Sequence, residues 1–136
     1  MNKDSVVKAS FSPDGSQLCT AALDNSLRVF KLESEEEGKK QKLELQHTIE
    51  GPSGDIEFLE WHATGKVILT GGKDKAAWLF SGITGNYLQI FSGHSGELTA
   101  GCFTPDGKSV VTAGLDAKVK VWNPKTGVVR YTLEAK

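Results

Sequence analysis

The stretch "TAGLDAKVKVW" (residues 112–122) opens with a threonine, has an aspartate four residues later and ends in a tryptophan six residues after that aspartate. The chain repeats this threonine–aspartate–aromatic pattern, at the same spacing, in two earlier places. The three sets are Thr20, Asp24 and Phe30; Thr70, Asp74 and Phe80; and Thr112, Asp116 and Trp122. A pattern that recurs three times indicates an internal repeat.

Each repeat begins with a further aromatic residue, at Phe11, Trp61 and Phe103, and a glycine follows each of these four residues later. The first two aromatic residues lie farther apart than the second and third. The difference comes from the charged tract "ESEEEGKK" (33–40), which we interpret as a loop inserted into an otherwise constant unit.

Short β-strands are predicted within each repeat. The second repeat contains four short apolar or alternating runs: "IEFLEW" (56–61), "KVILT" (66–70), "AAWLF" (76–80) and "YLQIF" (87–91). Turn-forming residues separate these runs, and no segment of the chain keeps a helical period of 3.6 residues. Four short strands in a unit of about 42 residues are typical of one blade of a β-propeller.

The sequence therefore predicts an all-β fold, a partial β-propeller over residues 1–136. It consists of three four-stranded antiparallel blades in an incomplete ring. The predicted blades span 4–49, 55–91 and 97–134, and the charged loop belongs to the first.

The repeated aspartate has a structural explanation. It falls in the tight turn between the second and third strands, where a carboxylate accepts backbone N–H bonds and fixes the turn. In the third repeat His94 lies nine residues before Phe103, and we expect His94, Thr112, Asp116 and Trp122 to form one hydrogen-bonded line. The pairs Thr70–Asp74 and Thr20–Asp24 recur without such a histidine, because Pro52 and Asn2 occupy its position.

These residues give the chain its resemblance to the WD-repeat family of propellers. Gly93-His94 corresponds to the family's Gly-His pair, and "VWN" (121–123) corresponds to its Trp-Asp pair, with Asn123 in place of the aspartate. The first two repeats depart further, with Phe30-Lys31 and Phe80-Ser81 at that position. We expect their blades to depend more on apolar packing.

A catalytic interpretation of His94, Thr112 and Asp116 is also open to test, since a histidine, a hydroxyl and an aspartate make up a hydrolase triad. The Thr–Asp pair recurs three times whereas the histidine occurs once, and a catalytic site is not normally repeated in every unit. His47 and His62 have no partners at metal-ligand spacing, and we interpret His62 as an exposed turn residue. We predict no enzyme activity and no cofactor or metal.

The composition of the chain argues against some classes of partner and location. The chain has 136 residues and a formal charge of −1, which favours neither nucleic acid nor an anionic membrane as a partner. The apolar runs are too short to span a bilayer, and the N-terminal residues lack a secretory h-region. Cys19 and Cys102 lie singly in strand-like runs, so we expect both to be buried, in a reducing compartment. The expected location is the cytoplasm.

Residues 49–125 resemble the angio-associated migratory cell protein family more specifically. The motifs are Glu50-Gly51-Pro52 with Glu60-Trp61-His62, then "FSGH", "FTPDGK" and "VWNPKTG". Fungal members of that family are ribosome-assembly chaperones. The resemblance implies binding to a newly made protein of the large ribosomal subunit, which is protected until assembly. A general WD-repeat scaffold in signalling or trafficking is the alternative.

A face for a basic protein partner is predicted at the starts of the blades. Asp55 and Glu97 lie six residues before Trp61 and Phe103, and Asp4 lies one position out of that register. Carboxylates on one face would steer a basic protein. The residues just before the repeated aspartates share this face: Leu23, Lys73 and Leu115.

Three blades leave two open faces, because each blade buries its apolar surface only against the next. We expect these faces to meet further blades of a larger propeller, or to associate with another chain or with a second copy, which would bring the total to six blades.

Overall fold

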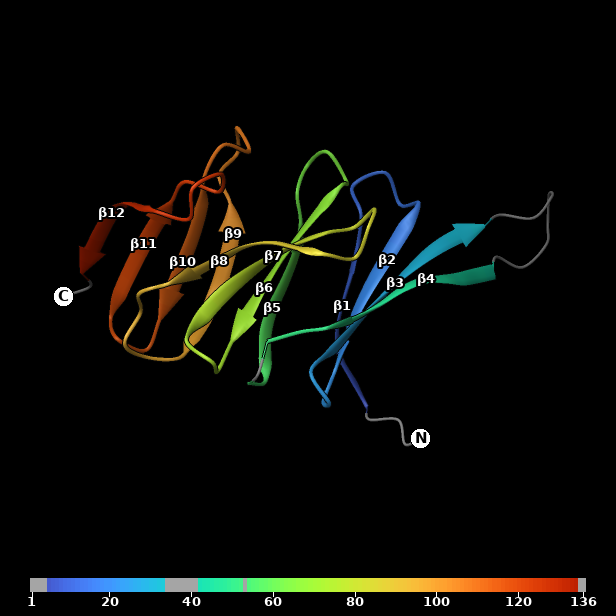
Figure 1. Cartoon of the computed structure of the whole chain (residues 1–136), viewed down its shortest axis with the longest axis horizontal. Coiled ribbons are helices and arrows are strands. Elements are labelled where there is room, and N and C mark those ends of the chain that lie inside the picture. Colours follow the sequence, from blue (N-terminus) through green and yellow to red (C-terminus); the bar gives the residue numbers. More distant parts are fainter. Residues whose placement is uncertain (1–4, 34–41, 53, 135–136) are drawn as a thin grey trace.

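The computed structural model describes residues 5–33, 42–52 and 54–134, and Asp4 and positions 34–40 of the charged tract lie outside them. The described residues form twelve strands and no helix, in three antiparallel four-stranded sheets (Figure 1). Consequently, this part of the chain contains no helix suited to crossing a membrane.

The sheets follow chain order, and we call them blades one, two and three. Blade one contains β1 (Val6–Phe11), β2 (Gln17–Ala22), β3 (Ser26–Glu33) and β4 (Lys42–Glu50). Blade two contains β5 (Ile56–Trp61), β6 (Val67–Gly72), β7 (Ala76–Ser81) and β8 (Tyr87–Ser92). Blade three contains β9 (Leu98–Phe103), β10 (Val110–Gly114), β11 (Lys118–Trp122) and β12 (Val129–Glu134).

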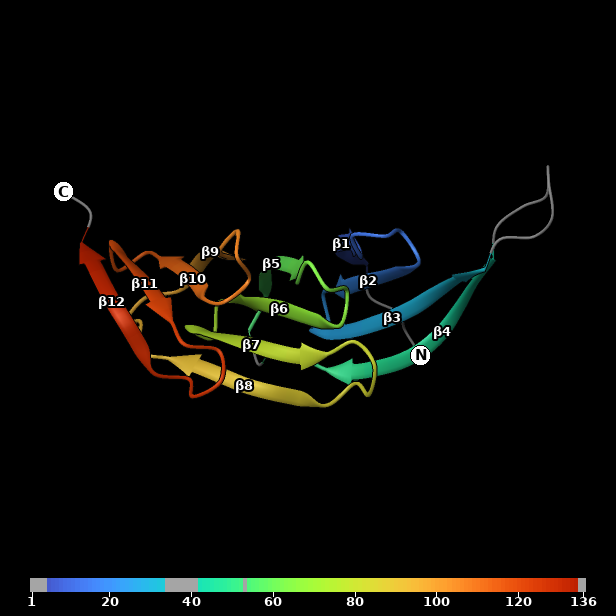
Figure 2. The same ribbon diagram turned by 90° about the horizontal axis from the view of Figure 1, so that it is seen from above.

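The blades stand side by side in an open arc, with β1, β5 and β9 in a row along its inner side (Figure 2). The first strand of each blade packs against the preceding sheet: β5 contacts β1 and β2, and β9 contacts β5, β6 and β7. Each sheet pairs only with itself in the backbone ladder. The predicted all-β, incomplete propeller is confirmed.

Each blade has a β-turn with a left-handed residue between its second and third strands. The residue after the repeated aspartate has a positive φ in every case: 69° at Asn25, 71° at Lys75 and 65° at Ala117. The aspartate accepts a backbone N–H from two residues further on, which offsets the cost of this conformation.

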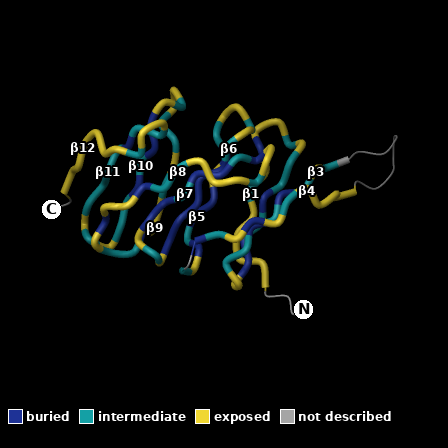
Figure 3. The backbone as a smooth tube through the Cα atoms, viewed as in Figure 1, coloured by how far each residue is buried: buried dark blue, intermediate teal, exposed yellow. Residues whose placement is uncertain are grey.

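Two apolar cores hold the blades together. The first lies between blades one and two and combines Val29 and Leu27 with Trp61, Ile68 and Phe80. The second lies between blades two and three and contains Phe58, Leu79, Phe91, Leu98 and Trp122. Burial is therefore greatest in blade two, which has a neighbour on both faces, and least along β12 and β1 (Figure 3).

The two cysteines differ. Cys19 is fully buried in the first core, and burial raises the pKa of its thiol to about 12. Cys102 is exposed, so the expectation that both are buried is wrong. It alternates with Phe103 on β9, and Phe103 faces blade two; Cys102 therefore points to the open face of blade three.

Candidate protein-interaction surfaces and the turns that support them

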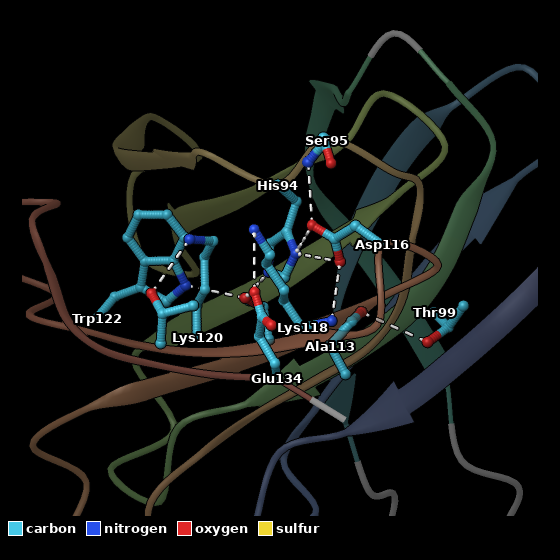
Figure 4. A network of polar contacts seen from close by, with 11 residues as sticks. His94, Ser95, Thr99, Ala113, Asp116, Lys118, Lys120, Trp122 and Glu134 are labelled. Carbon is cyan, nitrogen blue, oxygen red and sulfur yellow. Dashed lines mark hydrogen bonds and ion pairs between the residues drawn. The ribbon is translucent and has the colours of Figure 1, made fainter. Parts of the chain in front are cut away.

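The structure brings His94, Thr112, Asp116 and Trp122 together as a continuous hydrogen-bonded chain, which we call the His94 network (Figure 4). The Trp122 indole N–H donates to the Thr112 hydroxyl oxygen (2.9 Å), which lies 2.7 Å from His94 Nε2. His94 Nδ1 lies 3.0 Å from an Asp116 carboxylate oxygen. An indole only donates and a carboxylate only accepts, so Thr112 donates to Nε2 and Nδ1–H donates to Asp116 when the imidazole is neutral.

Asp116 is held from three directions. Besides His94, the backbone N–H groups of Ser95 (3.0 Å) and Lys118 (3.2 Å) donate to its carboxylate. Burial by itself would raise the pKa of Asp116, but the hydrogen bonds from His94, Ser95 and Lys118 outweigh it and hold the pKa below its usual value. The network thus ties the segment before β9 to the β10–β11 turn.

The His94 network is unsuited to nucleophilic catalysis. Thr112 is 1% exposed and its hydroxyl already has two partners, so no substrate reaches it. The described residues also contain no group of three or more His, Cys, Asp or Glu side chains that could hold a metal ion. The geometry supports a structural role for these residues.

In blade two the equivalent aspartate is held differently. The Trp78 indole N–H donates to Asp74 (3.0 Å), and the Ala76 N–H donates to the same carboxylate (3.2 Å). The Thr70 hydroxyl donates to the Phe58 carbonyl (2.9 Å). Trp78 was missed from the sequence, although an aromatic N–H donor four residues after the aspartate was visible there.

In blade one the aspartate has only local hydrogen-bond partners among residues 5–33, 42–52 and 54–134. Asp24 accepts from the Ser26 N–H (3.0 Å) and from its hydroxyl (2.6 Å), and these bonds lower the pKa of Asp24. Thr20 lies on β2, paired with Ala9 and Arg28. The structure therefore places a threonine and an aspartate at the same positions in all three blades, with a different set of contacts in each.

In blades two and three, glycine permits the close approach of the segment before the first strand to the aspartate turn. A Cβ atom on Gly96 would lie 2.8 Å from the Asp116 nitrogen, and one on Gly54 would lie 2.7 Å from the Asp74 nitrogen. A side chain at either position would therefore displace the aspartate turn.

The predicted partner face lies along this edge of the blades, which we call the aspartate rim: Leu23, Asp55, Lys73, Glu97 and Leu115. The backbone N–H of Lys73 donates to the Asp55 carbonyl, and that of Leu115 donates to the Glu97 carbonyl. Leu23 is bonded in the same way to Ser5, which replaces a carboxylate in blade one. Lys73 also forms an exposed ion pair with Asp55 at 3.7 Å.

Side chains that sequence reasoning assigned no role link neighbouring blades. His47 Nε2 lies 2.7 Å from the Ile83 carbonyl, and at the same position in the next blade the Gln89 amide donates to the Lys125 carbonyl (3.4 Å). His62 Nε2 bonds the Gly107 carbonyl at 2.9 Å. His62 is half-buried between blades, so its interpretation as an exposed turn residue is wrong.

The residue that replaces the aspartate of the Trp-Asp pair also has a structural use. Asn123 Oδ1 accepts the Lys125 N–H (2.9 Å), and in blade two the Ser81 hydroxyl accepts the N–H groups of Ile83 (3.1 Å) and Thr84 (3.0 Å). Each therefore caps the turn that leads into the last strand of its blade.

These features define a propeller segment built from WD repeats. The family model "WD domain, G-beta repeat" matches residues 2–31, 43–81 and 85–123, and the chain belongs to that family. The chain is 30% identical over 133 residues to the angio-associated migratory cell protein of Homo sapiens, covering 98% of this chain and 28% of that protein.

Two other similar proteins belong to different groups. One is the F-box-like/WD repeat-containing protein TBL1X of Mus musculus, 26% identical over 93% of this chain and 25% of that protein. The other is pre-mRNA-processing factor 19 of Oryza sativa subsp. japonica, 29% identical over 89% of this chain and 22% of that protein. The chain thus spans about a quarter of the length of these relatives.

Proposed function

We propose that the chain is a non-enzymatic protein-binding module that receives a basic client, a protein of the large ribosomal subunit, on the aspartate rim. It would act in the cytoplasm as part of a chaperone or scaffold during ribosome assembly. The resemblance to the angio-associated migratory cell protein family supports the class of client, and the rim supports the place of binding.

The observation that carries this proposal is that one edge of the blades presents both exposed leucines and carboxylates, with Leu115 and Glu97 bonded to each other in blade three. Leu23 is 53% and Leu115 is 69% exposed, so both side chains are accessible to a partner. Glu97 lies at the start of the strand bonded to Leu115, and Asp55 has the same position in blade two. An apolar contact flanked by carboxylates favours a partner that is basic and partly apolar.

The test is co-purification from cells at low and high salt with the double variant Asp55→Lys/Glu97→Lys. We expect a large-subunit ribosomal protein as the chief partner, and about a tenfold loss of affinity in the variant at low salt, since charges at an interface mainly steer association. Glu44→Lys, on exposed β4, is the matched control and should bind as the unmodified chain does. An assortment of signalling proteins as chief partners would instead support the general scaffold.

We further propose that two copies of the chain associate. The open face of blade one in each copy would bind the open face of blade three in the other copy. Blade one buries a set of side chains against blade two. The equivalent positions on the open face of blade three all hold apolar residues: Val111, Ala113, Val119, Val121 and Leu133. Blade two likewise buries a set of side chains against blade one. The equivalent positions on the open face of blade one are also all apolar: Val6, Ala9, Phe11, Leu18 and Phe30.

The position that links neighbouring blades also recurs in blade three. Tyr131 of β12 lies where His47 and Gln89 lie in the other two blades, and its side chain is 64% exposed. Two copies joined head to tail would form six blades, with each new interface resembling the two already inside the chain. Analytical ultracentrifugation should show a dimer that Val121→Lys weakens and Leu115→Lys, on the aspartate rim, does not. A monomer at all concentrations would contradict this association.

A further inference from the structure

A second surface lies at the edge of blades two and three opposite the aspartate rim. Antiparallel strands place the β5–β6 and β9–β10 turns at one edge and the aspartate turns at the other (Figure 1). At the first edge a cavity of about 390 Å³ opens between the two blades. It is lined by the His62 ring and mainly by apolar side chains: Val67, Leu79, Leu88, Phe103 and Pro124.

The walls of this cavity are fixed by hydrogen bonds across the blade boundary. The Thr64 N–H donates to His62 Nδ1 (3.1 Å), so Nε2 of the neutral ring carries the proton and donates to the Gly107 carbonyl (2.9 Å). The His62 ring meets Phe103 edge to face, with centroids 4.9 Å apart. On the far side Gln89 holds the Lys125 carbonyl. A site built in this way needs little ordering when a ligand binds.

The mouth of the cavity is basic. An adjoining hollow of about 500 Å³ shares Gly107, Pro124 and Lys125 with the cavity and adds Lys108 and Arg130. Lys108, Lys125 and Arg130 are exposed, and none has a carboxylate at ion-pair distance among the described residues. Asp106, the acidic residue of the neighbouring turn, accepts from the Lys108 N–H and the Thr104 hydroxyl and thereby fixes its own turn.

We infer that this groove binds an acidic protein segment that inserts a leucine or phenylalanine side chain between blades two and three. The apolar cavity takes the anchor, and the three cations pair with carboxylates that flank it. The phosphates of a nucleic acid would use the cations but gain nothing from the apolar cavity. The groove lies within the chain, between two blades that already pack together, so it exists whatever covers the open faces.

The experiment is fluorescence anisotropy of the whole chain with a fluorescein-labelled octapeptide that has a Leu-Phe pair between two acidic triplets. We expect saturable binding that weakens when Ser-Ser replaces Leu-Phe and is lost when lysine triplets replace the acidic ones. An oligothymidylate of the same length serves as the competing polyanion. Amide shifts in a ¹H–¹⁵N spectrum should be confined to residues 62–67, 88–89, 103–108 and 123–130.

Three variants locate the site. Lys108→Glu/Lys125→Glu should weaken binding about tenfold or more at low salt, because both cations face the flanking carboxylates. The Leu88 side chain is half-exposed, so Leu88→Gln should leave the fold intact. This variant should weaken binding about threefold, because it removes an apolar contact worth roughly one methylene group. Lys73→Glu, at the aspartate rim, removes one cation elsewhere and should leave binding unchanged.

Several results would overturn the inference. Equal binding of the Ser-Ser peptide, or equal competition by the oligothymidylate with no effect of Leu88→Gln, would show a surface for polyanions in general. Amide shifts at the aspartate rim, an equal loss in Lys73→Glu, or no saturable binding would place the acidic segment elsewhere or nowhere on the chain.

Discussion

Blades two and three fix the same turn with donors from different parts of the chain. Asp116 receives the His94 hydrogen bond from a segment 22 residues earlier, whereas Asp74 receives the Trp78 hydrogen bond from the strand that directly follows the turn. The histidine therefore joins two loops, and the tryptophan strengthens one hairpin. At the histidine position blade two has Pro52, which is fully buried and holds the corresponding segment by packing.

This difference separates the part of the repeat that is the same in all three blades from the part that varies. The aspartate and the threonine occur in all three blades, and the aspartate accepts the same backbone N–H each time. The side-chain donor changes from a serine hydroxyl to an indole to an imidazole. The turn requires an acceptor in a fixed place, and several donors can satisfy it.

The largest effect is expected from His94→Leu. It leaves the Asp116 carboxylate, whose side chain is 3% exposed, without its side-chain donor, and should lower the free energy of unfolding by about 3 kcal/mol. The counterpart Trp78→Phe keeps most of the packing, removes one hydrogen bond and should cost about 1 kcal/mol. Urea unfolding of both variants measures the difference, and equal losses would contradict a special role for the long-range link.

A smaller effect is expected from acid. Because the folded-state pKa of Asp116 is lowered, its contribution to stability is fully present above the unfolded carboxyl pKa of about 3.9 and is lost as the pH falls through the folded value. The free energy of unfolding should therefore decline between about pH 5 and pH 2. Asp116→Asn should be less stable at neutral pH and decline less. An identical pH profile in the two proteins would refute this contribution of Asp116.

The smallest effect should have the opposite sign. Ala117 has a φ of 65°, which an L residue with a Cβ adopts only at a cost, and Ala117→Gly should raise the free energy of unfolding by about 0.5–1 kcal/mol. Asn25→Gly should gain less, because asparagine tolerates this region better than alanine. Thermal unfolding of the two variants gives the comparison. A loss of stability in Ala117→Gly would show that the methyl group is needed for packing.

The fold could be predicted from the sequence because the repeat makes the same local choices three times. The spacing of Gly15, Gly65 and Gly107 from their aromatic residues predicts the turns, and the structure gives all three a positive φ. Each further match reduced the number of alternative folds. The three aspartate turns followed from the same argument.

What could not be predicted arises between blades. Whether a polar strand residue such as His47 or Gln89 faces solvent or the next blade depends on how the blades are placed, and the order of residues does not give that placement. The same holds for Cys102, whose apolar run predicted burial although the side chain is exposed, as is that of Glu60 at the equivalent position of blade two. The groove at His62 was missed for this reason, since its two walls come from different repeats.

The links made by His47 and Gln89 lie on β4 and β8, at the broad end of each wedge, while β5 and β9 pack at the narrow end. Two neighbouring blades that contact each other at both their inner and outer strands cannot rotate about the inner strands without breaking the hydrogen bond at the outer ones. Rotation between adjacent sheets is therefore restrained at the inner strands and at the outer strands. The curvature of the arc is thus set by contacts within this chain.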